Sequence, residues 1–194
     1  MSPHRNKKLA EHVSAATRLP LIAVPLFLVV GAASDGVRGL LWAFICLFLT
    51  SGLSLAYLLY LTRAGKVRDP RRILQAERTR PLWVVAGLHA AAFSLVTLLD
   101  TPAPLHAVLL SYALATLLFA LLTPLTNLSL HTAGISGAAV CLAYVFGLWG
   151  ALAVLLVPLV WWARRVLGRH TPMELAVGVL VGGGGTWLAF WLIV

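Results

Sequence analysis

The segment from Arg164 to Glu174 gathers the side chains best suited to chemistry in an otherwise apolar chain. It holds four of the five Asp, Glu, Lys or Arg residues between positions 82 and 194, together with His170. Because such side chains are costly next to hydrocarbon, a cluster of them favours a function. His170 and Glu174 are four residues apart, which makes them neighbours if a helix begins near Thr171.

These residue types suit phosphoryl transfer. A carboxylate that accepts the proton of one imidazole nitrogen fixes the tautomer and leaves the other nitrogen free as a nucleophile. Glu174 and His170 can form such a pair. Arg164 and Arg80 carry planar guanidinium groups that can hold phosphate oxygens through paired hydrogen bonds. The pattern predicts phosphoryl transfer through a phosphohistidine at His170.

The same side chains fall in three polar islands along the chain. The first island is "QAERTRPL" (75–82), the second is "NLSLHTAG" (127–134), and the third is "ARRVLGRHTPMEL" (163–175). The second contributes Ser129, whose hydroxyl can bind phosphate, and His131, an imidazole that can give a proton to a leaving oxygen. One helical hairpin fits between consecutive islands, so we expect all three to converge at one membrane surface.

The islands resemble the three motifs of the type 2 phosphatidic acid phosphatase superfamily, the lipid phosphate phosphatases. Arg164 and His170 are spaced as in the third motif, Arg-x5-His-x3-Asp, with Glu174 in the place of the aspartate. Ser129-Leu-His131 is similar to the Ser-Gly-His motif, with leucine in the glycine position. The resemblance implies that His170 is the nucleophile, Glu174 its acidic partner and His131 the acid for the leaving group.

The first family motif is only partly matched. Arg80-Pro81 corresponds to its end, and the resemblance implies that Arg80, Ser129 and Arg164 hold phosphate. The motif's lysine would fall at Ile73, so another arginine must substitute for it, and the candidates are Arg71, Arg72 and Arg78. The implied activity needs no cofactor and no metal, and the implied substrate is an amphiphilic lipid or prenyl phosphate.

Composition predicts an all-α protein that crosses a membrane several times. Of the 194 residues, 60% are hydrophobic and 11% are charged, as in polytopic membrane proteins. A spanning helix needs about 20 apolar residues. The apolar stretch at 133–163 would rise about 46 Å as one helix, which exceeds a core of about 30 Å, and "GLWG" at 147–150 offers a turn. We therefore predict six or seven spans, at Leu19–Ser34, Gly39–Thr62, Leu82–Leu99, Leu105–Pro124, Ala133–Trp149, Gly150–Leu167 and Pro172–Ile193.

The charges predict an orientation. Fifteen basic and six acidic residues give a net charge of +9, and the basic residues flank apolar runs. This placement favours anionic lipid headgroups over nucleic acid as the partner. With seven spans, the basic segments all fall on one side, which the positive-inside rule assigns to the cytoplasm of a cell-membrane protein. We expect a basic cytoplasmic leader at 1–18 and a single transmembrane phosphatase-like domain at 19–194. A signal peptide is the alternative for the first stretch, and the oligomeric state stays open.

Other function classes fit the sequence less well. Enzymes that hold Mg²⁺ need clustered acids, whereas the six acids here are scattered, at Glu11, Asp35, Asp69, Glu77, Asp100 and Glu174. A transporter would need polar residues near mid-membrane, where the spans offer His89 and a few hydroxyl groups. A transporter or a non-catalytic membrane protein with the same fold remains the alternative. We expect His89 and His106 to be packing or interface residues, Arg165 and Arg169 to anchor at lipid headgroups, and "GGGG" at 182–185 to be a helix-packing surface.

Overall fold

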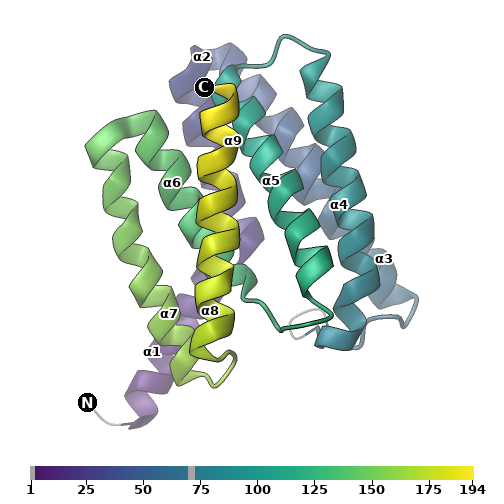
Figure 1. Ribbon diagram of the computed structural model, residues 1–194, viewed down its shortest axis with the longest axis vertical. Coiled ribbons are helices and arrows are strands. Elements are labelled where there is room, and N and C mark those ends of the chain that lie inside the picture. The colour runs from purple at the N-terminus through teal and green to yellow at the C-terminus, as the bar shows by residue number, and fades with distance from the viewer. Residues whose placement is uncertain (1–2, 70–72) are drawn as a thin grey trace.

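The computed structural model describes residues 3–69 and 73–194, and the regular elements in them are all helical. Figure 1 shows a bundle of helices that run roughly along its long axis. In chain order, the elements are α1 (Pro3–Ala16), α2 (Leu19–Leu47), the π-helix η1 (Phe48–Gly52), α3 (Leu53–Arg63), α4 (Gln75–Thr97), α5 (Ala103–Leu122), α6 (Leu130–Ala151), the 3₁₀ turn η2 (Leu152–Leu155), α7 (Leu156–Val166), α8 (Pro172–Val179), the π-helix η3 (Leu180–Gly184) and α9 (Gly185–Ile193).

Five continuous helical stretches are long and apolar enough to cross a membrane, and two of them are folded back on themselves. Within α2 the backbone leaves helical geometry at Asp35 and Gly36, where Gly36 has a φ of 50°. Residues 31 and 39 would lie about 12 Å apart in a straight helix. Instead, the backbones of Gly31 and Gly39 approach so closely that neither has room for a side chain. The chain therefore reverses here.

The same reversal occurs in α6, where Gly147 has a φ of 58° and Gly150 packs against the backbone of Leu142. Figure 1 shows the chain turning over at this point and descending as α7. The 37-residue helical stretch Leu130–Val166 thus forms two legs, as the length of the apolar run predicted. With both reversals, the described residues of this all-α membrane bundle form seven apolar legs, and the second reversal lies in the predicted "GLWG".

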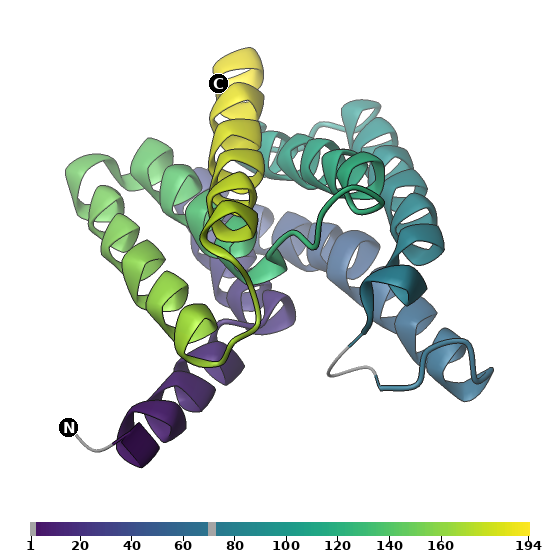
Figure 2. The same cartoon turned by 60° about the horizontal axis from the view of Figure 1, so that its bottom comes forward.

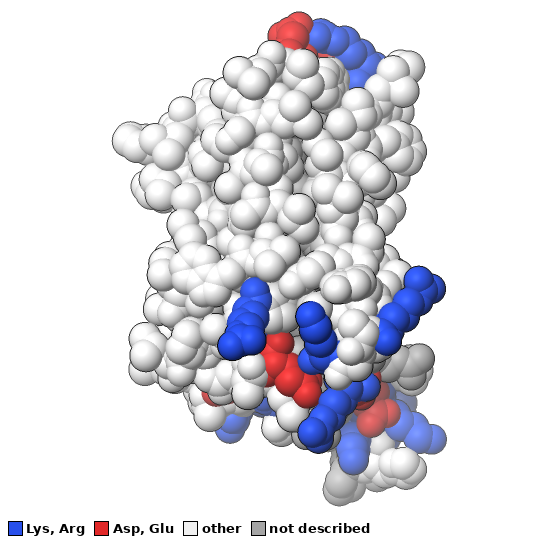
Figure 3. All heavy atoms as spheres, turned by 90° about the vertical axis from the view of Figure 1, so that its right-hand side faces the viewer, with Lys and Arg blue, Asp and Glu red and all other residues white. Residues whose placement is uncertain are grey.

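Charged side chains mark the two ends of the bundle. Figure 3 shows a wide belt without charges, with most of the visible Lys and Arg side chains gathered at the lower end. At the other end, Arg38 forms ion pairs with Asp35 and Asp100. The start of α4, the α5–α6 connection and the α7–α8 connection all lie at the lower end (Figures 1 and 2). The three polar islands therefore share one surface of the bundle, as predicted.

The glycine-rich segment is a packing surface, as predicted. A Cβ atom on Gly182 would collide with the backbone of Ala133 on α6, whereas one on Gly184 would meet nothing within 4 Å. Hydroxyl groups add to this contact, since Thr132 donates to the Leu175 carbonyl oxygen at 3.2 Å and Ser136 to that of Val179 at 3.2 Å. Small and hydroxyl residues allow such close helix pairs in membranes.

This contact predicts a stability difference between two glycines of one π-helix. Gly182→Ala must push α6 and η3 apart, so we expect it to lower the free energy of unfolding by about 1–3 kcal/mol. Gly184→Ala, the matched control, should leave it unchanged. Thermal unfolding of both variants in detergent measures the difference. Equal melting temperatures for the two variants would contradict the packing described here.

Candidate functional site

The third island is shaped by the beginning of the last membrane leg. Thr171 caps α8, and its hydroxyl accepts a hydrogen bond from the backbone N–H of Glu174 at 3.3 Å. In return, Oε2 of Glu174 accepts from the Thr171 N–H at 2.8 Å. The sequence Thr-Pro-Met-Glu produces this capping box because the N-cap and third residues satisfy each other's free donors. The box holds the Glu174 carboxylate 3.4 Å from Nδ1 of His170.

The His170 ring is buried and its two nitrogens have different partners. Nδ1 lies 2.9 Å from the carbonyl oxygen of Asn127, which can only accept, so this nitrogen carries the proton. Nε2 then has a free electron pair, and Nη2 of Arg164 donates to it at 3.1 Å. The Asn127 carbonyl is nearer than the Glu174 carboxylate. It is therefore the main acceptor that fixes the tautomer, a role that the sequence assigned to Glu174.

The surroundings of His170 disfavour its charged form. Burial lowers the pKa of His170, and the positive charges of Arg164 and Arg78 lower it further. The Asn127 carbonyl and the Glu174 carboxylate act in the opposite direction. Since the ordinary histidine pKa is about 6.5, the ring is neutral at pH 7. A neutral ring with its electron pair on Nε2 is the form that can act as a nucleophile.

This balance predicts a pH effect for Glu174→Gln. The Glu174 charge raises the His170 pKa, so its removal should lower that pKa and shift the acidic limb of the kcat/KM profile to lower pH. Phosphate release measured against pH for both proteins tests this. The substrate's own phosphate pKa is common to both profiles, so the shift between them belongs to the enzyme. A limb that stays in place or moves toward neutral pH would refute the role of Glu174.

The N-terminal helix brings a residue that the sequence did not indicate. Ser14 of α1 is buried, and its hydroxyl accepts a hydrogen bond from Nη1 of Arg164 at 2.8 Å. Its carbonyl oxygen accepts one from Nε2 of His131 at 3.2 Å. Ser14 thus links the second and third islands. The available signal was the pair of small residues Ala10 and Ser14, which lie four apart on the buried face of α1.

His131 lies at the first turn of α6 and belongs to the same cluster. The charge of Arg164 acts on it. Its contact with a carbonyl oxygen shows that Nε2 carries the proton. The structure therefore brings together His131, Arg164, His170 and Glu174, as the sequence predicted.

Of the first-island arginines, Arg78 approaches the cluster. It is partly buried, its charge acts on both His170 and Arg164, and its guanidinium donates to the carbonyl oxygen of Ile73 at 3.0 Å. Arg80, two residues on, is exposed and lines a surface hollow together with Lys66 and Glu77. Two residues turn a helix by about 200°, so both arginines cannot face one site. The structure does not bring Arg80 to the cluster, and Arg72 and Arg71 lie outside the described residues.

Ser129 lies beside the cluster in a structural position. It is the N-cap of α6, its hydroxyl accepts from the N–H of Thr132 at 3.4 Å, and its side chain is fully buried. Its own N–H donates to the Glu174 carbonyl oxygen at 3.4 Å, which ties α6 to α8. Phosphate binding by this hydroxyl stays a prediction.

Arg165 is exposed, as expected for a headgroup anchor, and it also makes a structural contact. Its Nη1 donates to the carbonyl oxygen of His170 at 3.1 Å, so it helps to hold the α7–α8 turn. Gly168 in this turn has a φ of 59°, a conformation that glycine adopts readily. Arg169 is exposed, as expected for an anchor.

Two guanidinium groups at the site have donors without a partner. Within residues 3–69 and 73–194, the buried Nε atoms of Arg78 and Arg164 have no hydrogen-bond acceptor. Buried polar atoms are nearly always paired, and a pair of cationic donors from two different helices favours an anionic ligand. The cluster can therefore bind an anion next to the free electron pair of His170.

No family model matches the chain, and no curated protein or solved structure matches it. The resemblance to lipid phosphate phosphatases therefore rests on the residues of the three islands.

Proposed function

We propose that the protein is an integral membrane phosphatase that hydrolyses a phosphomonoester or diphosphate of a lipid or isoprenoid, with a phosphohistidine intermediate on His170. One observation carries the proposal above all. Nε2 of His170 accepts a hydrogen bond from Nη2 of Arg164 at 3.1 Å, at the headgroup end of a membrane bundle. A phosphate oxygen that takes over this guanidinium donor would release the electron pair of Nε2 for attack. A nucleophile and a phosphate-binding group are thus already neighbours where a lipid headgroup would lie.

The reaction proceeds in two balanced steps. First, Nε2 of His170 attacks phosphorus and the bond from phosphorus to the lipid oxygen breaks. His131, protonated on both ring nitrogens beside the bound phosphate anion, gives its Nε2 proton to that oxygen and becomes neutral. The released lipid is an alcohol or, from a diphosphate, a monophosphate. Water then attacks the phosphohistidine, the N–P bond breaks, and a proton of the water returns to His131. Inorganic phosphate leaves and both imidazoles regain their starting state.

The other residues hold the substrate and the nucleophile. Arg164 and Arg78 neutralise the charge that develops on the phosphoryl oxygens, where a fixed cation lowers the barrier without reorganisation. Asn127 and Glu174 stabilise the proton on Nδ1 as His170 becomes positively charged in the phosphohistidine. Ser14 supports these assignments, since its two oxygens already accept hydrogen bonds from Arg164 and His131. In the proposed reaction, Arg164 binds the phosphate and His131 protonates the leaving oxygen.

The proposal includes a location. The basic end of the bundle faces the cytoplasm of a cell membrane, in line with the positive-inside rule. The site then meets lipids from the side on which soluble enzymes make phosphorylated precursors. The proposed partners are the substrate and membrane lipid.

Purified protein should release inorganic phosphate from lipid phosphates without a metal ion. We would assay phosphatidate, phosphatidylglycerophosphate, farnesyl phosphate and farnesyl diphosphate in detergent micelles, with and without EDTA. Activity on at least one of them should be unchanged by EDTA, because the proposed mechanism uses arginines in place of metal ions. Strict dependence on added Mg²⁺ would place the protein in another enzyme class. No release from any of them would favour a transporter or a non-catalytic protein.

A further inference from the structure

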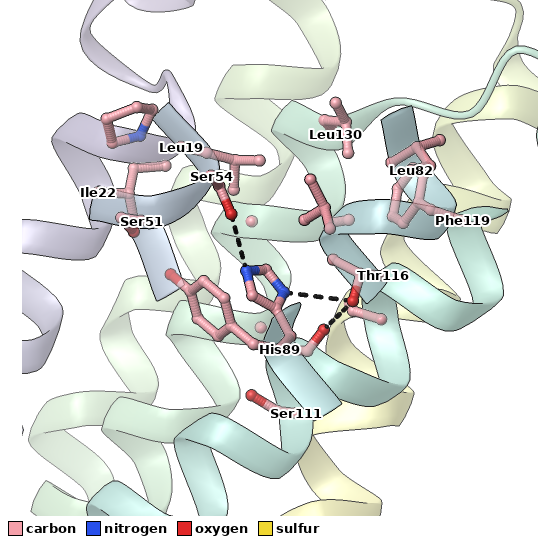
Figure 4. A pocket seen from close by; sticks show the side chains of 18 of the residues that line it. Leu19, Ile22, Ser51, Ser54, Leu82, His89, Ser111, Thr116, Phe119 and Leu130 are labelled. Atoms are coloured by element: carbon pink, nitrogen blue, oxygen red, sulfur yellow. Dashed lines mark hydrogen bonds between the residues drawn. The ribbon is translucent and has the colours of Figure 1, made fainter. Parts of the chain in front are cut away.

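An apolar cavity of about 300 Å³ begins beside Arg78, one residue of the proposed site, and extends into the middle of the bundle. Its wall consists almost entirely of carbon atoms from α2, α3, α4, α5 and α6 (Figure 4). Ligand pockets commonly measure about 300–1,000 Å³, so this cavity is at the small end of that range. It is separate from the polar cluster but reaches it at one end.

The outer end of the cavity is marked by Arg78 and Leu130. Arg78 is also one of the proposed phosphate-binding groups, and Leu130 directly precedes His131. Leu19 and Ile22, at the start of α2, line the same cavity (Figure 4). A chain attached to a phosphate that Arg78 holds can therefore reach this cavity.

A buried polar group, His89, lies in the wall of the cavity. His89 lies about 16 Å beyond Arg78 along α4, at 1.5 Å per residue, which is near the middle of a core of about 30 Å. Its Nε2 is 3.1 Å from the Ser54 hydroxyl and its Nδ1 is 3.3 Å from that of Thr116. Figure 4 shows these bonds joining α3, α4 and α5 across the cavity. The edge of the His89 ring also contacts Tyr112.

Both π-helices of the described chain line the deep part of this cavity, through Ser51 of η1 and Gly182 of η3. A π segment inserts an extra residue per turn and is frequent at functional sites. Two such segments around one space indicate a shaped binding site, since close packing is the ordinary state of a helix bundle.

We infer that this cavity binds the hydrocarbon tail of the substrate, and that it admits one chain of limited length. The inference rests on the proposed function for the position of the phosphate. The small volume of about 300 Å³ leaves room for one chain of limited length and excludes the second chain of a diacyl lipid. The substrate class is therefore a single-chain lipid phosphate, either a short prenyl phosphate or a monoalkyl phosphate.

The test compares chain lengths in the unmodified protein and in Ala115→Leu. Ala115 on α5 is half-buried and lines the cavity, so a leucine there fills part of it. Ala90→Leu on the exposed face of α4 is the matched control. The substrates are dimethylallyl, geranyl, farnesyl and geranylgeranyl phosphates, dodecyl phosphate and phosphatidate, in nanodiscs. Comparing the prenyl phosphates with dodecyl phosphate shows whether the preferred single chain is an isoprenoid or a straight alkyl chain.

We expect kcat/KM to rise with chain length to a maximum and then to level off, and phosphatidate to be at least about tenfold poorer than the best single-chain substrate. Each buried methylene contributes a factor of about four, so Ala115→Leu should lose at least about tenfold on the preferred chain. It should keep its rate on dimethylallyl phosphate, which shows that the variant folds. Equal losses on short and long chains, or a preference for phosphatidate, would overturn the inference.

Binding separates this inference from the proposed function. Isothermal titration of a farnesyl phosphonate into His170→Ala protein needs no turnover. At least about tenfold weaker binding in the His170→Ala, Ala115→Leu double variant would support the cavity even if no substrate were hydrolysed. Unchanged binding would refute it even if the protein were an active phosphatase.

Discussion

His170→Ala should lose phosphate release by at least about 10³-fold, the scale on which an enzyme fails when its nucleophile is removed. The electron pair of Nε2 has no substitute nearby, because Nε2 of His131 carries a proton that points to Ser14. The loss should appear in kcat, since Arg164 and Arg78 would still bind the phosphate. Phosphate release from the best substrate, measured under single-turnover and steady-state conditions, gives both parameters.

The covalent intermediate offers a second readout of the same variant. A lipid phosphate labelled with ³²P should transfer label to the unmodified protein, as an acid-labile phosphohistidine, and transfer none to His170→Ala. His4→Ala is the matched control, because His4 is exposed on α1. Label that persists in His170→Ala, or an unchanged rate, would end the mechanism.

Apolar segment lengths were enough to predict the legs of the bundle. The apolar stretch at 133–163 was too long for one span, and the chain does reverse at Gly147. Likewise, the break between the first two predicted spans falls at Asp35 and Gly36. Such predictions succeed because bilayer thickness limits helix length, and glycine accepts the backbone angles of a tight reversal.

The local part of the site could also be predicted, because it depends on neighbours in the sequence. Arg164, His170 and Glu174 are close in the sequence, around the α7–α8 turn and the capping box that begins α8. In the structure, Arg164 donates to His170, and the Glu174 carboxylate lies beside His170. The choice between Arg78 and Arg80 was harder, because it depends on the rotation of α4 against the bundle. A motif match at Arg80-Pro81 carries no information about that rotation.

Contacts between distant segments were not predictable from spacing. The Asn127 oxygen that lies beside Nδ1 of His170 is a backbone carbonyl, so any residue type at that position could supply it. Ser14 sits in a leader whose basic residues indicated only membrane orientation, yet α1 lies alongside α7 (Figures 1 and 2). A single serine on a short helix gives no sign of which partner it will meet.

Arg164→Ala is expected to lower kcat/KM by about 10²–10³-fold, the usual cost of losing one preorganised group that stabilises transition-state charge. Arg164→Lys should recover only part of this, since an ammonium keeps the charge but cannot donate to His170 and a phosphate oxygen as a planar fork does. Arg169→Ala, a neighbouring exposed arginine, is the matched control. Steady-state phosphate release from the best substrate measures all three variants.

The pH profile of kcat/KM distinguishes a catalytic role of Arg164 from a purely structural role. The Arg164 charge lowers the His170 pKa, so its removal in Arg164→Ala should raise that pKa and move the acidic limb of kcat/KM to higher pH. Arg164→Lys keeps a positive charge near the ring and should move the limb less. These shifts are opposite in sign to the one expected for Glu174→Gln. A loss of rate in Arg164→Ala with no shift of the limb would mean that Arg164 does not act on the nucleophile.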